Sequence, residues 1–105
     1  MIRTIPFRFG ALGAAGILLA LTAPALAYTG QNLAGHAKVT ITQARQFALK
    51  AHTGKITDEE LEREAGGSGL RYSFDIRTGS RTHEVGVDAA TGKVLESKAE
   101  GPHPD

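Results

Sequence analysis

Residues 70–77 alternate strictly between apolar and polar side chains, and no other feature of the sequence constrains the fold as much. The apolar positions of this run are Leu70, Tyr72, Phe74 and Ile76. In an extended strand, residues two apart share one face, so the run predicts a strand that is buried on one face and polar on the other. Sheets with one covered face are typically antiparallel, because parallel sheets are covered on both faces.

Two further segments extend this strand into an antiparallel meander. Residues 82–88 place His83, Val85 and Val87 on one face, and residues 94–96 return as a short last strand. The connections have turn chemistry. In the second connection, Gly92 is expected to adopt a positive φ.

A stripe of small apolar residues with helical spacing precedes the strands. It consists of Ala44, Phe47, Ala48 and Ala51. Thr42 is expected to be the N-cap and Gly54 the left-handed C-cap. Because Phe47 is the one large side chain of the stripe, we expect it to anchor the helix on the sheet.

The segment between helix and strands supports two interpretations. Residues 56–65 have high helix propensity, and Thr57 with Glu60 could form a capping box. The apolar spacing argues against a helix, because Ile56 and Leu61 are the only large apolar residues of the segment. The residues alone leave helix and strand open here.

The N-terminal segment has the organisation of a signal peptide. Residues 1–8 are basic, residues 9–21 are apolar, and no charged residue follows Arg8 until Lys38. A basic start followed by an apolar run of this length is typical of export signals.

Small residues predict where such a signal would be cleaved. Ala25 and Ala27 occupy both positions that a signal peptidase reads, so we expect cleavage between Ala27 and Tyr28. An uncleaved anchor over residues 9–28 is the alternative, since that stretch could just span ~30 Å of hydrocarbon. In both cases the body is exported, and we expect a periplasmic or secreted protein.

Composition excludes several functional classes. From residue 28 onward, ten basic side chains face eleven acidic ones, so the body lacks the positive field that nucleic acid requires. The absence of cysteine excludes disulfides, thiol catalysis and thiolate metal sites. We therefore expect no nucleic-acid partner and, after cleavage, no membrane association.

Three stretches together resemble the PepSY domain. They are Ile41-Thr42-Gln43-Ala44 through Ala51-His52-Thr53-Gly54-Lys55, then Leu70-Arg71-Tyr72-Ser73-Phe74-Asp75-Ile76, then Val85 through Leu95. Val87-Asp88-Ala89-Ala90-Thr91-Gly92-Lys93-Val94-Leu95 is the most specific part. The resemblance implies an α+β fold with one N-terminal helix packed across a four-stranded antiparallel sheet. It also implies that residues 56–65 form a strand, against their propensity.

The resemblance also suggests a domain organisation and a role. We expect a signal peptide at 1–27, a flexible spacer at 28–38, the PepSY-like domain at 39–97 and a disordered tail at 98–105. Such domains occur in propeptides of thermolysin-like metallopeptidases and as free-standing exported proteins. The implied function is a non-catalytic binding module that modulates or inhibits a peptidase or another envelope enzyme by protein contact.

The remaining chemistry-bearing residues do not predict an enzyme. His83-Glu84 begins like a zinc motif, but Val87 stands where the second histidine would be, and the stretch alternates as a strand. The other histidines are widely spaced, and no serine lies in a nucleophile elbow. We expect no catalytic residue, no cofactor and no metal.

The polar face of the sheet is the expected docking surface. It would carry Arg71, Ser73, Asp75, Arg77, Glu84 and Gly86, with bare backbone at Gly86. A partner could bind this face or add a strand to a sheet edge. Alternatively, these side chains only keep the sheet soluble.

Two other functions remain open from the residues alone. A periplasmic metal or small-ligand sensor could use His83, Glu84 and the acidic run at 58–64. A structural envelope protein could self-associate through a sheet edge, as a weak homodimer.

Overall fold

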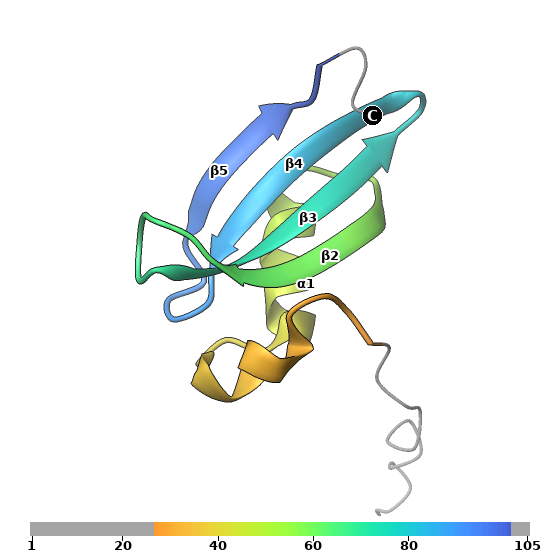
Figure 1. Ribbon diagram of the computed structural model, residues 1–105. Helices are drawn as coiled ribbons and strands as arrows, with labels where there is room; N and C mark the ends of the chain where they lie inside the picture. Colours follow the sequence, from red (N-terminus) through yellow and green to blue (C-terminus); the bar gives the residue numbers. More distant parts are fainter. Residues whose placement is uncertain (1–26, 102–105) are drawn as a thin grey trace, which may run out of the picture.

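The four strands of the sheet follow one another in both sequence and space. The computed structural model describes residues 27–101, and Figure 1 shows their arrangement. The elements are a 3-10 helix, η3 (Gln31–His36), the helix α1 (Ile41–Ala51), and the strands β2 (Lys55–Arg63), β3 (Leu70–Thr78), β4 (Arg81–Asp88) and β5 (Val94–Ala99). The sheet is antiparallel in the order β2-β3-β4-β5, so the expected α+β fold is confirmed.

Strand β2 forms despite its helix propensity because pairing and burial outweigh local preference. It is antiparallel to β3, and its buried residue Leu61 lies opposite Tyr72 and is 2% exposed. On its other edge, the Leu61 amide donates a hydrogen bond to the Thr29 carbonyl, at 2.8 Å. Tertiary contacts of this kind override propensities worth only tenths of a kcal/mol per residue.

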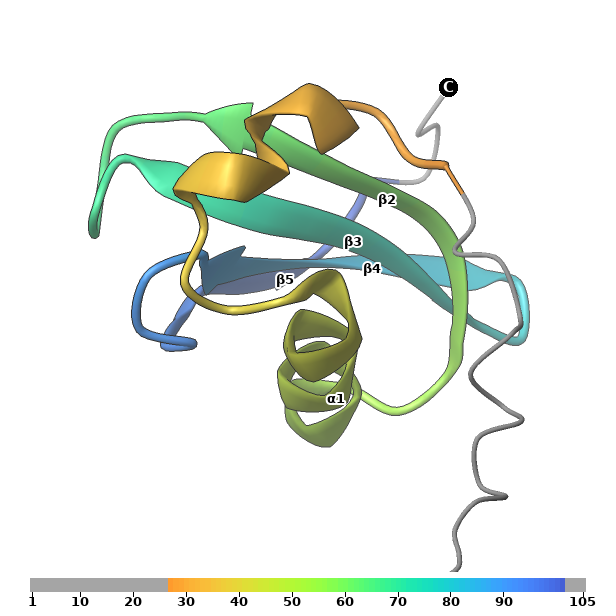
Figure 2. The ribbon, with the colours of Figure 1, turned by 90° about the horizontal axis from the view of Figure 1, so that it is seen from below.

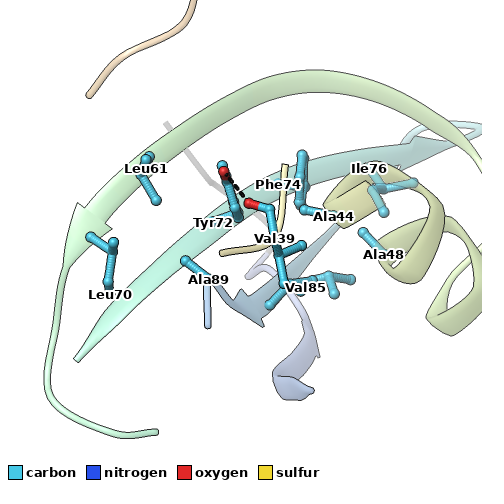
Figure 3. Packing of buried hydrophobic residues seen from close by; sticks show 11 residues of the cluster. Val39, Ala44, Ala48, Leu61, Leu70, Tyr72, Phe74, Ile76, Val85 and Ala89 are labelled. Carbon is cyan, nitrogen blue, oxygen red and sulfur yellow. Dashed lines mark hydrogen bonds between the residues drawn. The ribbon is translucent and has the colours of Figure 1, made fainter. Parts of the chain in front are cut away.

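The core lies between α1 and the sheet (Figure 3). The four apolar residues of the alternating run in β3 are all buried, as the period of two predicts. From α1, Ala44 and Ala48 are completely buried, and Figure 3 shows them on the side of the helix turned toward the sheet. The Tyr72 hydroxyl donates to the Val39 carbonyl at 2.7 Å, which ties the segment before α1 to the core.

The predicted ends of the helix were both wrong. The N-cap is Thr40, whose hydroxyl accepts from the Gln43 amide, while the Gln43 side chain accepts from the Thr40 amide. This reciprocal capping box satisfies two groups, which a cap at Thr42 could not do, because Arg45 would stand at the position of Gln43 and cannot accept a hydrogen bond. At the other end, the C-cap is His52 in an extended conformation, and Gly54 plays no such role.

The expected anchoring role of Phe47 was also wrong, since this side chain is 40% exposed. The two buried alanines bring α1 close to the sheet, so a large residue beside them has no room beneath the helix. Its ring lies against the β4–β5 turn, where a Cβ on Gly92 would come within 2.6 Å of Phe47 Cε2. The predicted positive φ of Gly92 is confirmed, at 82°.

The segment expected to be a flexible spacer at 28–38 is structured. It contains η3, and Leu33 and Ala34 pack against the core. Gly30 has a φ of 84°, and a Cβ there would overlap the Leu61 carbonyl, so only glycine allows the two backbones to approach this closely.

The expected disordered tail at 98–105 begins as ordered strand. β5 continues to Ala99, and the Glu100 amide donates to the Thr82 carbonyl at 2.9 Å. Residues 102–105 and the expected signal segment up to residue 26, with Ala25, lie outside the described residues. Within residues 27–101 no helix is both long and apolar enough to cross a membrane.

We expect Ala48→Leu to destabilise the protein by about 1–3 kcal/mol, because the added carbons would overpack the helix–sheet contact. The unfolding free energy from urea titration measures this cost. Ala51→Leu makes the same change at an exposed position at the end of α1 and should leave stability nearly unchanged. Equal effects of the two substitutions would contradict the proposed packing.

Candidate functional site: the outer face of the sheet

One face of the sheet is not covered by any helix of the described chain. We call this side, opposite α1, the outer face. Figure 1 views it with α1 behind the strands, and Figure 2 shows α1 on the other side. The strand register places fourteen residues on the outer face: Lys55, Asp58, Glu60, Glu62, Arg71, Ser73, Asp75, Arg77, Thr82, Glu84, Gly86, Asp88, Glu96 and Lys98.

The outer face is predominantly acidic. Seven of its residues carry carboxylates and four carry positive charges. The pairing of β2 with β3 even places Asp58 opposite Asp75. Like charges directly opposite one another in a sheet are destabilising. A surface with this arrangement attracts positive groups from outside.

Burial and, after it, this repulsion raise the pKa values of two carboxylates. Burial, followed by the charges of Glu62 and Asp58, raises the pKa of Glu60. Burial, followed by the charges of Glu96 and Asp75, raises the pKa of Glu84. Each shift means that the folded chain holds these groups in their charged form at a cost.

Arg71 is the central positive charge of the outer face, and its side chain is only 9% exposed. Its guanidinium lies 3.3 Å from a Glu96 oxygen and donates to the Ala65 carbonyl at 3.1 Å. It lies over Gly86, where a Cβ would come within 3.2 Å of Arg71 Nη1. The backbone at Gly86, expected to be bare, is therefore covered by Arg71.

The remaining expected docking residues differ in accessibility. Ser73 is buried and donates to a Glu62 carboxylate oxygen at 2.8 Å. Asp75 and Glu84 are half-buried, and Arg77 is exposed. Three of the six expected residues are thus buried beneath other side chains: Arg71, Ser73 and Gly86.

The carboxylates of β2 were missed as members of this face. Asp58, Glu60 and Glu62 lie two apart, so they share a face as soon as the segment is a strand. Their neighbour Glu59 points the other way and binds Arg45 of α1 through two contacts of 2.7 and 2.8 Å. The two-residue spacing of these acids is visible in the sequence, but it places them on one face only in a strand. In a helix they would point in different directions.

Asp88, which lies on the outer face opposite Arg71, has a structural role. Its carboxylate accepts from the Ser68 amide and hydroxyl, at 2.8 and 2.7 Å, and from the Ala90 amide at 2.7 Å. Burial would raise the pKa of Asp88, but these hydrogen bonds hold it below its ordinary value. Asp88 thereby ties the β2–β3 loop to the β4–β5 turn.

The described residues contain no group of three or more histidine, aspartate or glutamate side chains that could hold a metal ion. The fold does bring two distant histidines together, because His52 at the end of α1 stacks on His83 of β4. No sequence signal predicts this pair, since it depends on where the helix ends over the sheet. The outer face itself attracts positively charged groups through its excess of carboxylates.

We expect Glu84→Gln to stabilise the protein at pH 7 by on the order of 0.2–1 kcal/mol, because it removes one of several mutually repelling charges. The gain should shrink as the pH falls through the raised pKa of Glu84, since the protonated wild-type side chain no longer repels its neighbours. Thermal unfolding at pH 7 and near pH 4.5 measures both effects. Glu59→Gln should have the opposite sign at pH 7, because it breaks the contact with Arg45.

We expect Arg71→Met to cost about 1–3 kcal/mol. Methionine preserves apolar cover over Gly86, but it leaves Glu96 and the Ala65 carbonyl without their donor. Urea unfolding measures the loss. Arg77→Met makes the same change at an exposed site, so an equal loss there would show that burial of Arg71 is not the cause.

Comparison with known proteins identifies the family. Residues 38–98 match the model of the peptidase propeptide and YPEB domain, PepSY. This match covers more than half of the chain. Searches of curated proteins and of solved structures return no match. PepSY domains are often propeptides of peptidases or inhibitor-like modules, are generally non-catalytic, and are typically extracellular or periplasmic. The match coincides with α1 and the complete sheet, and the chain therefore belongs to the PepSY family.

Proposed function

We propose that this protein is an exported, non-catalytic binding module that modulates a peptidase or another cell-envelope enzyme through protein–protein contact. The outer face is the surface we assign to this contact. Its accessible side chains include Glu60, Asp75 and Glu84, so the partner should present lysine or arginine side chains. Charge complementarity of this kind speeds association and selects partners.

The crowding of carboxylates on the outer face carries this proposal: Asp58 lies directly opposite Asp75, and Glu60 and Glu84 lie on the same face of the sheet. A surface that only needed to be soluble could alternate charges of both signs across its strands. Here carboxylates lie side by side, and the resulting repulsion costs stability. A positively charged partner would relieve it.

The sheet edges offer a second element of the contact. The β2 edge is occupied in part by Thr29, which forms a bridge with Glu60. In residues 27–101 no strand pairs with the far edge of β5, which exposes Ser97, Lys98 and Ala99. An extended segment of the partner could pair with this edge while its basic side chains reach the outer face.

Export is part of the same proposal. Cleavage after Ala27 would leave Tyr28 as the first residue, and the Tyr28 carbonyl accepts from the Gln31 amide at the start of η3. The body would thus begin where its packed structure begins. N-terminal sequencing of the protein recovered from the periplasm or medium should give Tyr28 first. A retained N-terminal segment would favour the anchor instead.

The experiment that tests the function measures binding to a panel of envelope peptidases, including thermolysin-like metallopeptidases, at two salt concentrations. We expect one or more to bind, and the affinity to fall as salt rises. The double substitution Glu60→Gln with Glu84→Gln should weaken binding a few-fold, as expected for partly exposed charges at about 0.2–1 kcal/mol each.

Glu59→Gln is the matched control, because Glu59 neighbours Glu60 on β2 but faces α1. If this variant weakens binding equally, the outer face is not the contact surface. If no peptidase or other envelope protein binds, the proposed function fails. Sedimentation of the protein alone, showing a dimer broken by substitutions in β5, would favour the self-associating alternative.

A further inference from the structure

A hollow opens at the end of the sheet where the β3–β4 hairpin meets the end of α1. Its volume is about 260 Å³, enough for several water molecules at about 30 Å³ each or for one small ligand. It is lined by His52, Thr78, Arg81, Thr82, His83 and Ala99. Among these residues only Thr82, which pairs with Arg77, also lies on the outer face, so the hollow is largely a separate feature of the chain.

The two imidazoles of the hollow form a parallel stack. The centroids of His52 and His83 are 3.7 Å apart, and the ring planes differ by 6°. His83 Nε2 lies 2.8 Å from the Ser97 hydroxyl, and His52 Nε2 lies 3.4 Å from the Thr78 hydroxyl. Among the described residues, no hydrogen bond involves Nδ1 of either ring. Each ring is therefore held on one side and has one nitrogen left for a ligand.

The charges around the hollow favour an anion. Arg81 is the only permanently charged residue of its lining, and no carboxylate lines it. Glu100, the acidic residue that follows β5, is engaged in an interaction of its own. Just outside the lining, Lys50 and Lys55 flank the end of α1, while Glu84 follows His83 and Glu100 follows Ala99 along the chain.

Positive charges on the two stacked rings would repel each other. Burial, followed by the charge of His52, lowers the pKa of His83. A proton on one ring thus opposes a proton on the other, because no negative group lies between them. A bound anion would supply that missing group and would allow both rings to donate.

We propose that this hollow binds a small oxyanion, the carboxylate or phosphate group of a ligand. The Arg81 guanidinium and the protonated rings of His52 and His83 are its donors, and the Thr82 hydroxyl adds a neutral one. Binding takes up protons, so it strengthens as the pH falls toward 6. The proposal is independent of the partner assigned to the outer face.

Nuclear magnetic resonance tests this with the intact protein. The ring signals of the histidines are followed from pH 5 to 8 in sodium chloride, sodium acetate or sodium phosphate at equal ionic strength. We expect saturable shifts of the ring signals of His52 and His83, and an upward pKa change for His83, in acetate or phosphate but not in chloride. The acetate and phosphate arms show which oxyanion is preferred. His36, exposed in η3, is the internal control and should respond equally to all three salts.

Arg81→Gln should weaken the binding about tenfold, as expected for one charge-assisted hydrogen bond. Arg77→Gln removes an exposed charge outside the lining and should leave the affinity within twofold. The proposal is overturned if the shifts do not saturate, if chloride reproduces them, or if both substitutions act alike. Binding of Zn²⁺ by the two rings, without any response to acetate or phosphate, would also overturn it.

Discussion

A single helix of eleven residues can cover only one face of a four-stranded sheet, and this limit determines the rest of the structure. The covered face is closed by the two alanines of α1, whose small side chains let the helix approach the strands. Because the body has no cysteine, this contact and the apolar side chains beneath it hold the fold without covalent support. The opposite face has to remain stable with water on one side.

The outer face meets that requirement with its own side chains. Arg71 covers the glycine of β4 and interacts with Glu96, while Ser73 satisfies an oxygen of Glu62. Through these contacts, Arg71 and Ser73 at the centre of the face already have partners within the chain. The carboxylates around them remain partly accessible and repel one another, as the raised pKa values of Glu60 and Glu84 indicate. Stability and binding thus use different residues of one surface.

The sequence predicts much of this architecture because apolar and polar residues alternate with the period of two that is typical of strands. The alternation from Leu70 to Ile76 identified the buried face of β3, and the glycine-containing turns separated the strands. β2 could not be predicted from its residues, because its propensity is helical and the pairing that overrides it is a long-range contact. The family resemblance resolved that ambiguity, and the structure confirms the strand.

The site was less predictable, for two physical reasons. Whether Arg71 is exposed depends on the absence of a side chain at Gly86 across the sheet, which no local pattern reveals. For Phe47 the error is the opposite one. Its hydrophobicity predicts burial, but the close helix–sheet contact leaves space only for methyl groups, so the side chain is largely exposed. The pair formed by His52 and His83 depends on the end of α1, which was itself misplaced from the sequence.

The near-neutral charge of the body conceals a separation of charge that has functional consequences. Acidic side chains gather on the outer face, whereas the hollow at the β3–β4 hairpin is lined by Arg81 and two imidazoles. Net charge governs long-range attraction to polyelectrolytes, but a protein partner or a small ion responds to the field within about 10 Å, the screening length at 0.1 M salt. A chain with little net charge can therefore present one surface to a basic partner and another to an anion. The two can act independently, because they differ in sign and share only the neutral residue Thr82.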